Sequence, residues 1–384
     1  MAEQGEFSEI GHCGGQVVFH VRTTEDGSRT FQISYQGARP VPTVICGIYA
    51  LPQGIPVAAL ELRGIGQPWD PPPFPDCFSV FIGSDSQGKF GHQCWRCQGY
   101  WRSGGSPSLC PYCAQRGDRH HFLTKAQRLY VQQYCRLLYE ALNADHDGDH
   151  TIDMDAVADA VGIDSKKPPF YYTEESQQNK FICGSCGEFN DVLGTFAYCS
   201  VCGTRNDLQE LEEKTVARIR DRVNGGGPCE ACVKDTVAAF DSLAGSYATQ
   251  LVKRVPMRSG RKARIANMRF HNLQSVSTEL STSFDINIGE GLTSDDSAFA
   301  KIMFHRRHVY EHKGGEADEK YIADSGDTSV RPKQALHETK DSAHRLADIV
   351  VKMARNLHRG FHEIFPPLDK PILRYTETKR RLKG

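Results

Sequence analysis

Eight of the 14 cysteines form two groups with the same spacing. In each group a Cys-x2-Cys pair is followed, after twelve residues, by a second such pair. Each pair aims two thiolates at one ion and a hairpin brings the other pair opposite, which suits the tetrahedral geometry of Zn2+. The spacing therefore predicts two structural zinc sites per chain. The predicted ligands are Cys94, Cys97, Cys110 and Cys113 in the first site, and Cys183, Cys186, Cys199 and Cys202 in the second.

The two cysteine groups resemble rubredoxin-like zinc ribbons. Glycines and aromatic residues flank the pairs, such as Gly91 and Tyr112 in the first group and Gly184 and Tyr198 in the second. Four thiolates close the coordination sphere, so we expect structural zinc. Bound metal also supplies the folding energy that such short segments lack. A ribbon can bind nucleic acid, bind protein or only staple the fold, and the residues leave these roles open.

The other six cysteines do not repeat this pattern. We expect Cys13, Cys46, Cys77 and Cys135 to be small core residues. Cys229-x2-Cys232 is half a metal site at a predicted helix start, without the βαβ context of a redox motif; a third metal site shared with other cysteines or a second chain stays open. The N-terminal segment is acidic and lacks the apolar stretch of a signal peptide. In a chain without an export signal, 14 cysteines indicate metal binding in a reducing compartment and not disulfides, so we expect a cytoplasmic protein.

Length and charge narrow the class of protein. The 384 residues predict two to four domains. Lys and Arg total 46 against 47 Asp and Glu, which excludes a uniformly basic nucleic-acid-binding protein but allows local patches. Because no run of 18 apolar residues occurs, we expect no membrane-spanning helix.

Hydrophobic periodicity predicts a multidomain α+β protein. Alternating segments at 16–21 and 30–35 indicate strands, and longer helical patterns follow the glycine run at 225–227. We expect helices at 124–143, 228–253, 258–281, 297–312 and 334–360, with Pro366-Pro367 ending the helical region. The predicted domains are a β-rich region (1–90), a first ribbon (91–123), a helical connector (124–164), a second ribbon (165–207), a linker helix (208–227) and an all-helical bundle with a basic tail (228–384).

The predicted helix at 297–312 carries a possible catalytic motif. Arg307-x4-His312 and Arg306-x5-His312 both match the Arg-x4-6-His pattern of HEPN domains. The pattern alone is weak, since Arg116-x4-His121 also matches beside the first ribbon. The all-helical surroundings separate the two matches, and the chain from about 228 to 365 resembles a HEPN-like bundle.

This resemblance implies a homodimeric bundle whose two motifs face each other and cut RNA without metal. It implies that His312 is the acid or base and that Arg307 binds the phosphate, with Arg306 and His308 supporting. Residues five apart lie about 140° around a helix, whereas His308 and His312 are neighbours one turn apart. A polar helix end that only solubilises the chain is the alternative to catalysis.

A basic stretch between Leu251 and Thr278 contains no acidic residue and predicts a polyanionic partner such as RNA. Asn267, Arg269 and His271 are candidates to line a cleft. Internal pairing with the acidic loop at 285–296 would weaken this prediction. The seven predicted nucleic-acid-binding cations are Lys253, Arg254, Arg258, Arg261, Lys262, Arg264 and Arg269.

Together these features favour a metal-independent endoribonuclease with structural zinc ribbons, for which the resemblance suggests a role in bacterial antiviral defence or stress response. No Walker A loop, His-Glu-x2-His motif or Gly-x-Ser-x-Gly elbow offers another catalytic template. The first alternative is a non-catalytic zinc-ribbon protein that binds nucleic acid or protein and dimerises through its bundle. A second is a purely structural subunit of a larger defence complex.

Overall fold

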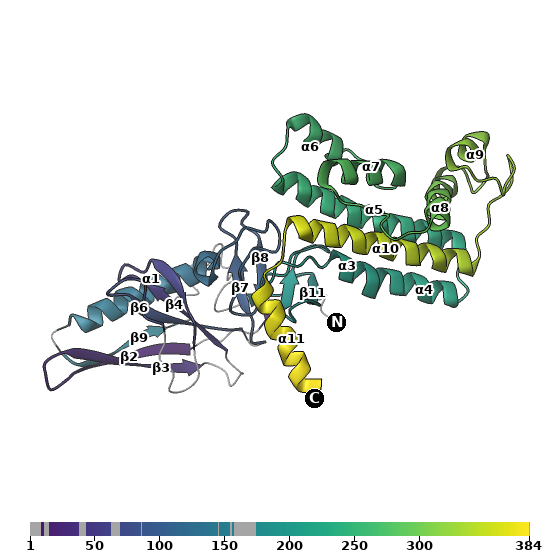
Figure 1. Cartoon of the computed structure of the whole chain (residues 1–384). Helices are drawn as coiled ribbons and strands as arrows, with labels where there is room; N and C mark the ends of the chain where they lie inside the picture. The colour runs from purple at the N-terminus through teal and green to yellow at the C-terminus, as the bar shows by residue number, and fades with distance from the viewer. Residues whose placement is uncertain are drawn as a thin grey trace. The chain divides into compact units, whose positions relative to one another are not determined.

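The computed structural model describes residues 9–10, 15–37, 44–62, 70–85, 87–144, 146–153, 156 and 174–383. They fall into two compact units, Met1–Thr204 with Leu368–Gly384, and Arg205–Pro367 (Figure 1). Strands lie in the N-terminal half and helices dominate the C-terminal half, which confirms the predicted mixed fold. Within the described ranges, no helix is long and apolar enough to cross a membrane.

The first unit begins with two three-stranded antiparallel sheets. One has the order β3-β2-β9 and the other β5-β4-β6. A further short pair joins β1 (Glu9–Ile10) to β10 (Glu174–Glu175). The sheet strands are β2 (Gly15–Thr23), β3 (Arg29–Gly37), β4 (Ile45–Ala50), β5 (Pro56–Leu60), β6 (Phe78–Gly83) and β9 (Gly148–Asp153).

Helix α1 (Lys125–Leu142) shares one apolar core with both sheets. A capping box fixes its start. The Thr124 hydroxyl accepts a hydrogen bond from the Gln127 backbone N–H, and the Gln127 side-chain oxygen accepts one from the Thr124 backbone N–H. The buried rings of Tyr130 and Tyr134 lie in this core, and their hydroxyls donate to carbonyls of β6. The helix predicted at 124–143 is therefore confirmed. A further short helix, expected around 153–161, lies almost wholly outside the described residues.

The two ribbons share a single four-stranded sheet of order β11-β12-β8-β7. In each ribbon the first Cys-x2-Cys turn is the tip of a hairpin, and the inner strands β8 and β12 pair with each other. The ribbons are therefore one structural module, although their first cysteines, Cys94 and Cys183, are 89 positions apart in the sequence. The strands are β7 (Phe90–Gln93), β8 (Tyr100–Ser103), β11 (Asn179–Ile182) and β12 (Phe189–Val192).

A buried ion network holds this double ribbon together. The fully buried guanidinium of Arg102 on β8 donates to Asp191 on β12 at 2.6 Å and to Asp85 at 2.6 Å. Such charges are tolerated in an interior only when they are paired and hydrogen-bonded. Arg102 therefore links both ribbons to Asp85, which lies just after the end of β6.

The chain ends in a helix that packs on the second ribbon. In α11 (Asp369–Lys383), Ile372 packs beside the second cysteine cluster and the Tyr375 ring lies against Gly187. The expectation that Pro366-Pro367 ends the helical region is therefore wrong. This segment belongs to the first unit, because its apolar side chains cover the ribbon.

The second unit is entirely helical among its described residues. α5 and α10 are its longest helices and pack side by side (Figure 1), with Tyr247 against Phe361 at 5.0 Å between ring centroids. α8 packs on α5, where Phe240 and Phe304 meet edge to face. The helices are α3 (Asp207–Gln209), a π-helical turn (Glu210–Val216), α4 (Ala217–Asn224), α5 (Cys229–Arg254), α6 (Ser259–Ala266), α7 (Leu273–Phe284), α8 (Ser294–His312), α9 (Glu319–Ser325) and α10 (Lys340–Ile364).

Two boundaries differ from the prediction. The single helix expected at 258–281 is two helices, because the chain turns after Ala266 and Asn272 caps a new helix by accepting from the Ser275 backbone. The last long helix starts at Lys340 and not at 334, because the Thr339 side chain caps it. The glycine run at 225–227 lies inside this unit, between α4 and α5.

Candidate metal centres and a histidine-lined cavity

All four Cys-x2-Cys turns have the same backbone geometry. In each, the first cysteine's N–H donates to the carbonyl five residues later, and its own carbonyl accepts from the N–H four residues later. That fourth residue has positive φ in every turn: Gln98, Ala114, Gly187 and Gly203. The repeated turn explains why the two sequence groups share one spacing.

The sulfur atoms of each group converge. Cys94 and Cys113 Sγ lie 3.7 Å apart, and Cys97 and Cys110 Sγ lie 3.6 Å apart. In the second group the corresponding distances are 3.7 and 3.5 Å. Four thiolates at about 2.3 Å from one Zn2+ lie roughly 3.8 Å apart in a tetrahedron. Both groups therefore fit a tetrathiolate metal ion, for which zinc is the natural choice.

In each group, hydrogen bonds from neighbouring thiols lower the pKa of one cysteine and favour its thiolate form. Hydrogen bonding from Cys110 is the main reason that the pKa of Cys113 is lowered to about 5. In the second group Cys183 is the main cause of a lowered pKa at Cys202. Because thiolates are the form that binds metal, each group readily supplies its first anionic ligand.

Cys229 and Cys232 lie in the first turn of α5. The buried Cys232 sulfur accepts from Arg222 Nε at 3.2 Å, while Cys229 is partly exposed. Neither belongs to a metal-ligand group among the described residues. Of the four isolated cysteines expected in a core, Cys46 and Cys135 lie in the core of the N-terminal sheets, Cys77 is only partly buried, and Cys13 lies outside the described residues.

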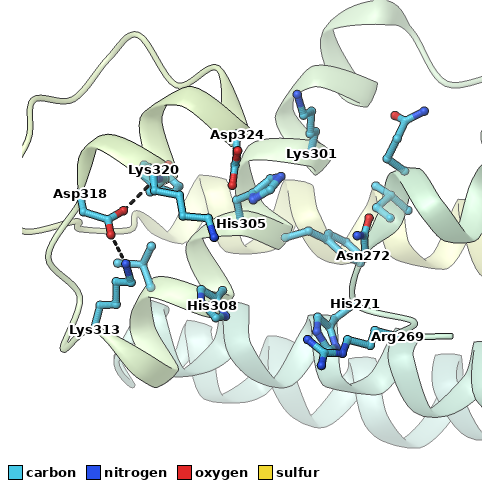
Figure 2. Close-up of a pocket in the computed structure, with 15 residues that line it drawn as sticks. Arg269, His271, Asn272, Lys301, His305, His308, Lys313, Asp318, Lys320 and Asp324 are labelled. Atoms are coloured by element: carbon cyan, nitrogen blue, oxygen red, sulfur yellow. Dashed lines mark hydrogen bonds and ion pairs between the residues drawn. The ribbon is translucent and has the colours of Figure 1, made fainter. Parts of the chain in front are cut away.

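The helical unit contains a cavity of about 410 Å3 between α8, α9 and the segment that leads into α7 (Figure 2). Its walls carry three histidines, and Figure 2 shows His271 facing His308 and His305 from the other wall. Four cations also line it: Arg269, Lys301, Lys313 and Lys320. Two carboxylates oppose them, Asp318, which pairs with Lys313, and Asp324 beside His305. The excess of cations suits an anionic ligand.

The four predicted catalytic residues lie in different surroundings. Arg306 is bound within the protein, where its guanidinium donates to Asp327 at 2.8 Å and to Glu338 at 3.0 Å. Both carboxylates are almost fully buried. Desolvation alone would raise the Asp327 pKa, but hydrogen bonds from Ser329, Tyr321 and Arg306 outweigh it and hold the pKa at about 2. Arg306 therefore anchors α8 to the start of α10.

Of the other three candidates, Arg307 is about as buried as Arg306, whereas His308 and His312 are exposed. Arg307 pairs with Glu311 at 2.9 Å, and its Nε has no hydrogen-bond partner in the described part of the chain. His308 lines the cavity, and its ring lies 4.8 Å from that of His312. Partial burial, and then the positive charges of His312 and Lys313, lower the pKa of His308. The His312 side chain is 58% exposed at the end of α8 and does not enter the bundle core.

The structure thus brings His308 and His312 together, as their one-turn spacing predicts, and separates Arg306 from them. The sequence reasoning missed His305 and Lys301 as cavity residues. Residues 301, 305, 308 and 312 recur at helical spacing, and this stripe could have revealed them. Arg269 and His271 line the cavity as expected, whereas Asn267 caps the end of α6.

The predicted basic stretch remains largely unneutralised. Arg264 forms an ion pair with Glu279 at 2.8 Å, whereas no ion pair is formed among the described residues by five of the cations: Lys253, Arg258, Arg261, Lys262 and Arg269. Arg254 stacks on Phe365. The acidic loop at 285–296 pairs instead with α10, through Arg345 and Arg359. Internal neutralisation by this loop is therefore not observed, and Lys253, Arg258, Arg261 and Lys262 are exposed.

Comparisons with protein-family models, with curated proteins and with solved structures find no match for this chain. The functional interpretation therefore depends on the geometry of two features. These are the two tetrathiolate groups in the first unit and the cationic, histidine-lined cavity in the second.

Proposed function

We propose that the helical unit binds RNA and cleaves it without metal at the histidine face of α8. The observation that carries this proposal is the contact between His308 and His312 at the edge of the cationic cavity. The zinc ribbons are structural in this proposal. The HEPN resemblance adds two further proposals. The protein forms a homodimer through the helical bundle, and it acts in bacterial defence or stress response.

Two adjacent imidazoles can supply both proton transfers that RNA cleavage needs. His308, whose lowered pKa keeps it neutral, takes the proton from a ribose 2′-OH. The 2′ oxygen attacks phosphorus, the bond to the 5′ oxygen breaks, and a protonated His312 gives its proton to that oxygen. The products are a 2′,3′-cyclic phosphate and a 5′-hydroxyl.

The phosphate and the flanking nucleotides need cationic partners. Arg307 can bind the scissile phosphate by exchanging its Glu311 partner for it, because the Glu311 carboxylate is partly exposed and can turn to water. Arg269 and Lys301 extend this charge through the cavity, and the exposed cations at Arg258, Arg261 and Lys262 extend it along α6. We assign Arg306 to the scaffold, because two carboxylates already hold it.

One observation favours the non-catalytic alternative. Both arginines of the motif are paired with carboxylates, so that neither guanidinium is free to receive a phosphate as the chain stands. In that reading the cavity and the basic surface bind an anionic partner and the bundle serves as a scaffold.

Cleavage of end-labelled RNA in EDTA separates the two functions. Removal of an acid or a base costs about 10²–10⁴ in rate, so His308→Ala and His312→Ala should each lose cleavage by that factor. His337→Ala is the matched control, because His337 is an exposed histidine of the same unit outside the cavity. Absence of cleavage by the wild type, or equal cleavage by all variants, would sink the nuclease proposal.

The pH profile gives a second check. His308 works in its neutral form and its pKa is lowered from 6.5, so activity should fall only when the pH drops below that value. An acidic limb centred at or above 6.5 would contradict the role of His308 as the base. RNA binding without cleavage, lost on Arg269→Ala, would instead support the non-catalytic alternative.

A further inference from the structure

A third group of potential metal ligands lies just after the first ribbon, outside both cysteine groups. Asp118, His120 and His121 each offer one ligand atom, and these atoms lie within 4.8 Å of one another. The sequence singled out only His121, as part of a second Arg-x4-His match. The three residues stand at the start of the short 3-10 helix η1 (Arg119–Phe122).

The turn that presents these side chains is firmly anchored. Arg119 is buried, and its guanidinium donates to the Gly47 carbonyl at 2.6 Å and to Ser106 Oγ at 2.7 Å. Phe122 is fully buried against Trp101 of the ribbon. Arg119 and Phe122 are three positions apart and share the inward face of this 3-10 turn, so His120 and His121 between them are turned away from that face.

The ring of His121 lies beside the other two ligands. Its Nδ1 accepts a hydrogen bond from the Asp118 backbone N–H at 3.1 Å. In the neutral ring this Nδ1 carries the lone pair and Nε2 carries the proton, so His121 binds an ion through Nδ1, which exchanges the Asp118 N–H for the metal. The His120 ring lies only 3.8 Å away between centroids.

His120 carries an unexplained polar atom. Its Nδ1 is buried and has no hydrogen-bond partner among the described residues. A buried nitrogen without a partner is unfavourable, and a bound ion would remove this cost.

We propose that Asp118, His120 and His121 form a third metal site, which binds a divalent first-row transition ion such as Zn2+. Two imidazoles and one carboxylate are ligands that zinc accepts readily. Three protein ligands leave a fourth position for water or an exogenous ligand, unlike the closed tetrathiolate groups. Asp118 and His121 are exposed, so their side chains can close around the ion, and the site exchanges metal more readily than the ribbons do.

Metal stoichiometry of the full reduced chain tests this site. After equilibration with buffered Zn2+, elemental analysis should find about three zinc ions per chain in the wild type and about two in His120→Ala. His121→Gln should also hold about two, although glutamine at this position preserves an acceptor for the Asp118 N–H. The control is His146→Ala, which removes an exposed histidine of the same unit and should still hold about three.

The ribbon zinc serves as an internal check on folding. Retention of about two ions by His120→Ala and His121→Gln shows that the tetrathiolate groups remain intact. Replacement with Co2+ gives a second readout, because the additional nitrogen- and oxygen-bound ion lacks the thiolate-to-cobalt absorption of the ribbons. A wild-type chain that binds only the two ribbon ions, or variants that match the wild type, would overturn the third site and leave a capped turn in its place.

Discussion

At the residue scale, neighbouring arginines have opposite surroundings. Arg306 lies between two buried carboxylates, and Arg102 in the ribbons has the same arrangement. Arg307, one position along α8, is similarly buried but has a single carboxylate partner, Glu311, which is 34% exposed. The sequence pattern accepts either Arg306 or Arg307 as the motif arginine. Only the placement of Asp327 and Glu338 distinguishes the scaffold residue from the candidate phosphate ligand.

Arg306→Ala should destabilise the helical unit by about 3–5 kcal/mol, because it leaves two buried carboxylates without a cation. Urea unfolding followed by the helical circular dichroism signal measures the change. Arg307→Ala is the matched control and should cost roughly 1 kcal/mol, because its one partner, Glu311, is 34% exposed and stays hydrated when the arginine is removed. Equal losses in the two variants would contradict the scaffold role of Arg306.

At the element scale, the four cysteine turns differ at one backbone position. The residue four after the first cysteine has φ of 73° and 82° at Gly187 and Gly203, where glycine is unstrained. In the first ribbon, Gln98 and Ala114 occupy the same conformation with φ of 60° and 55°. A left-handed residue with a Cβ costs about 1–2 kcal/mol, so the first ribbon stores strain that the second avoids.

Ala114→Gly should therefore stabilise the first ribbon by up to about 1 kcal/mol. This net value is the strain that glycine relieves in the folded turn less the greater conformational entropy that glycine gives the unfolded chain. Gly203→Ala should destabilise the second ribbon by about 1 kcal/mol through strain alone, because its added Cβ would meet only Leu109 at 3.4 Å. Competition with a chromogenic zinc chelator reports both changes as shifts in metal retention. Opposite signs would show that the turn conformation does not limit metal binding.

At the scale of the whole molecule, the two units have different sources of stability. The double ribbon has a small apolar cluster around its cysteines, and α11 packs on its second half. The helical unit contains its own core along α5, α8 and α10 and has no metal-ligand group among its described residues. Metal supplies much of the folding free energy of small ribbons but none of that of a helical core.

Zinc removal should therefore unfold the ribbons and release α11 while the helical unit stays folded. Under a strong chelator, trypsin should cut at Arg374 and Lys379 in the released α11, and a fragment close to Arg205–Pro367 should resist digestion. Mass spectrometry of the fragments, with the zinc-loaded chain as the control, measures this. Simultaneous loss of the helical circular dichroism signal would show that the helical unit also depends on metal.

The sequence by itself determined the features that depend on near neighbours. The spacing of the cysteines identified both tetrathiolate groups, Thr124 marked the start of α1, and the one-turn spacing placed His308 beside His312. It did not determine the separation of α6 from α7, where a local asparagine cap interrupts a continuous helical pattern. Periodicity reports which face of an element is apolar, but a cap can end the element without changing that pattern.

Only the tertiary structure decided which distant segments meet. It joined the two ribbons through β8 and β12, packed α11 on the second ribbon, and placed Asp327 and Glu338 around Arg306. It also assembled the cavity from α8, α9 and the segment before α7. In these contacts, Arg306 and Asp327 are 21 positions apart in the sequence, and Gly187 and Tyr375 of α11 are 188 apart. No local pattern encodes them, because they follow from the burial of complementary surfaces once all the elements have formed.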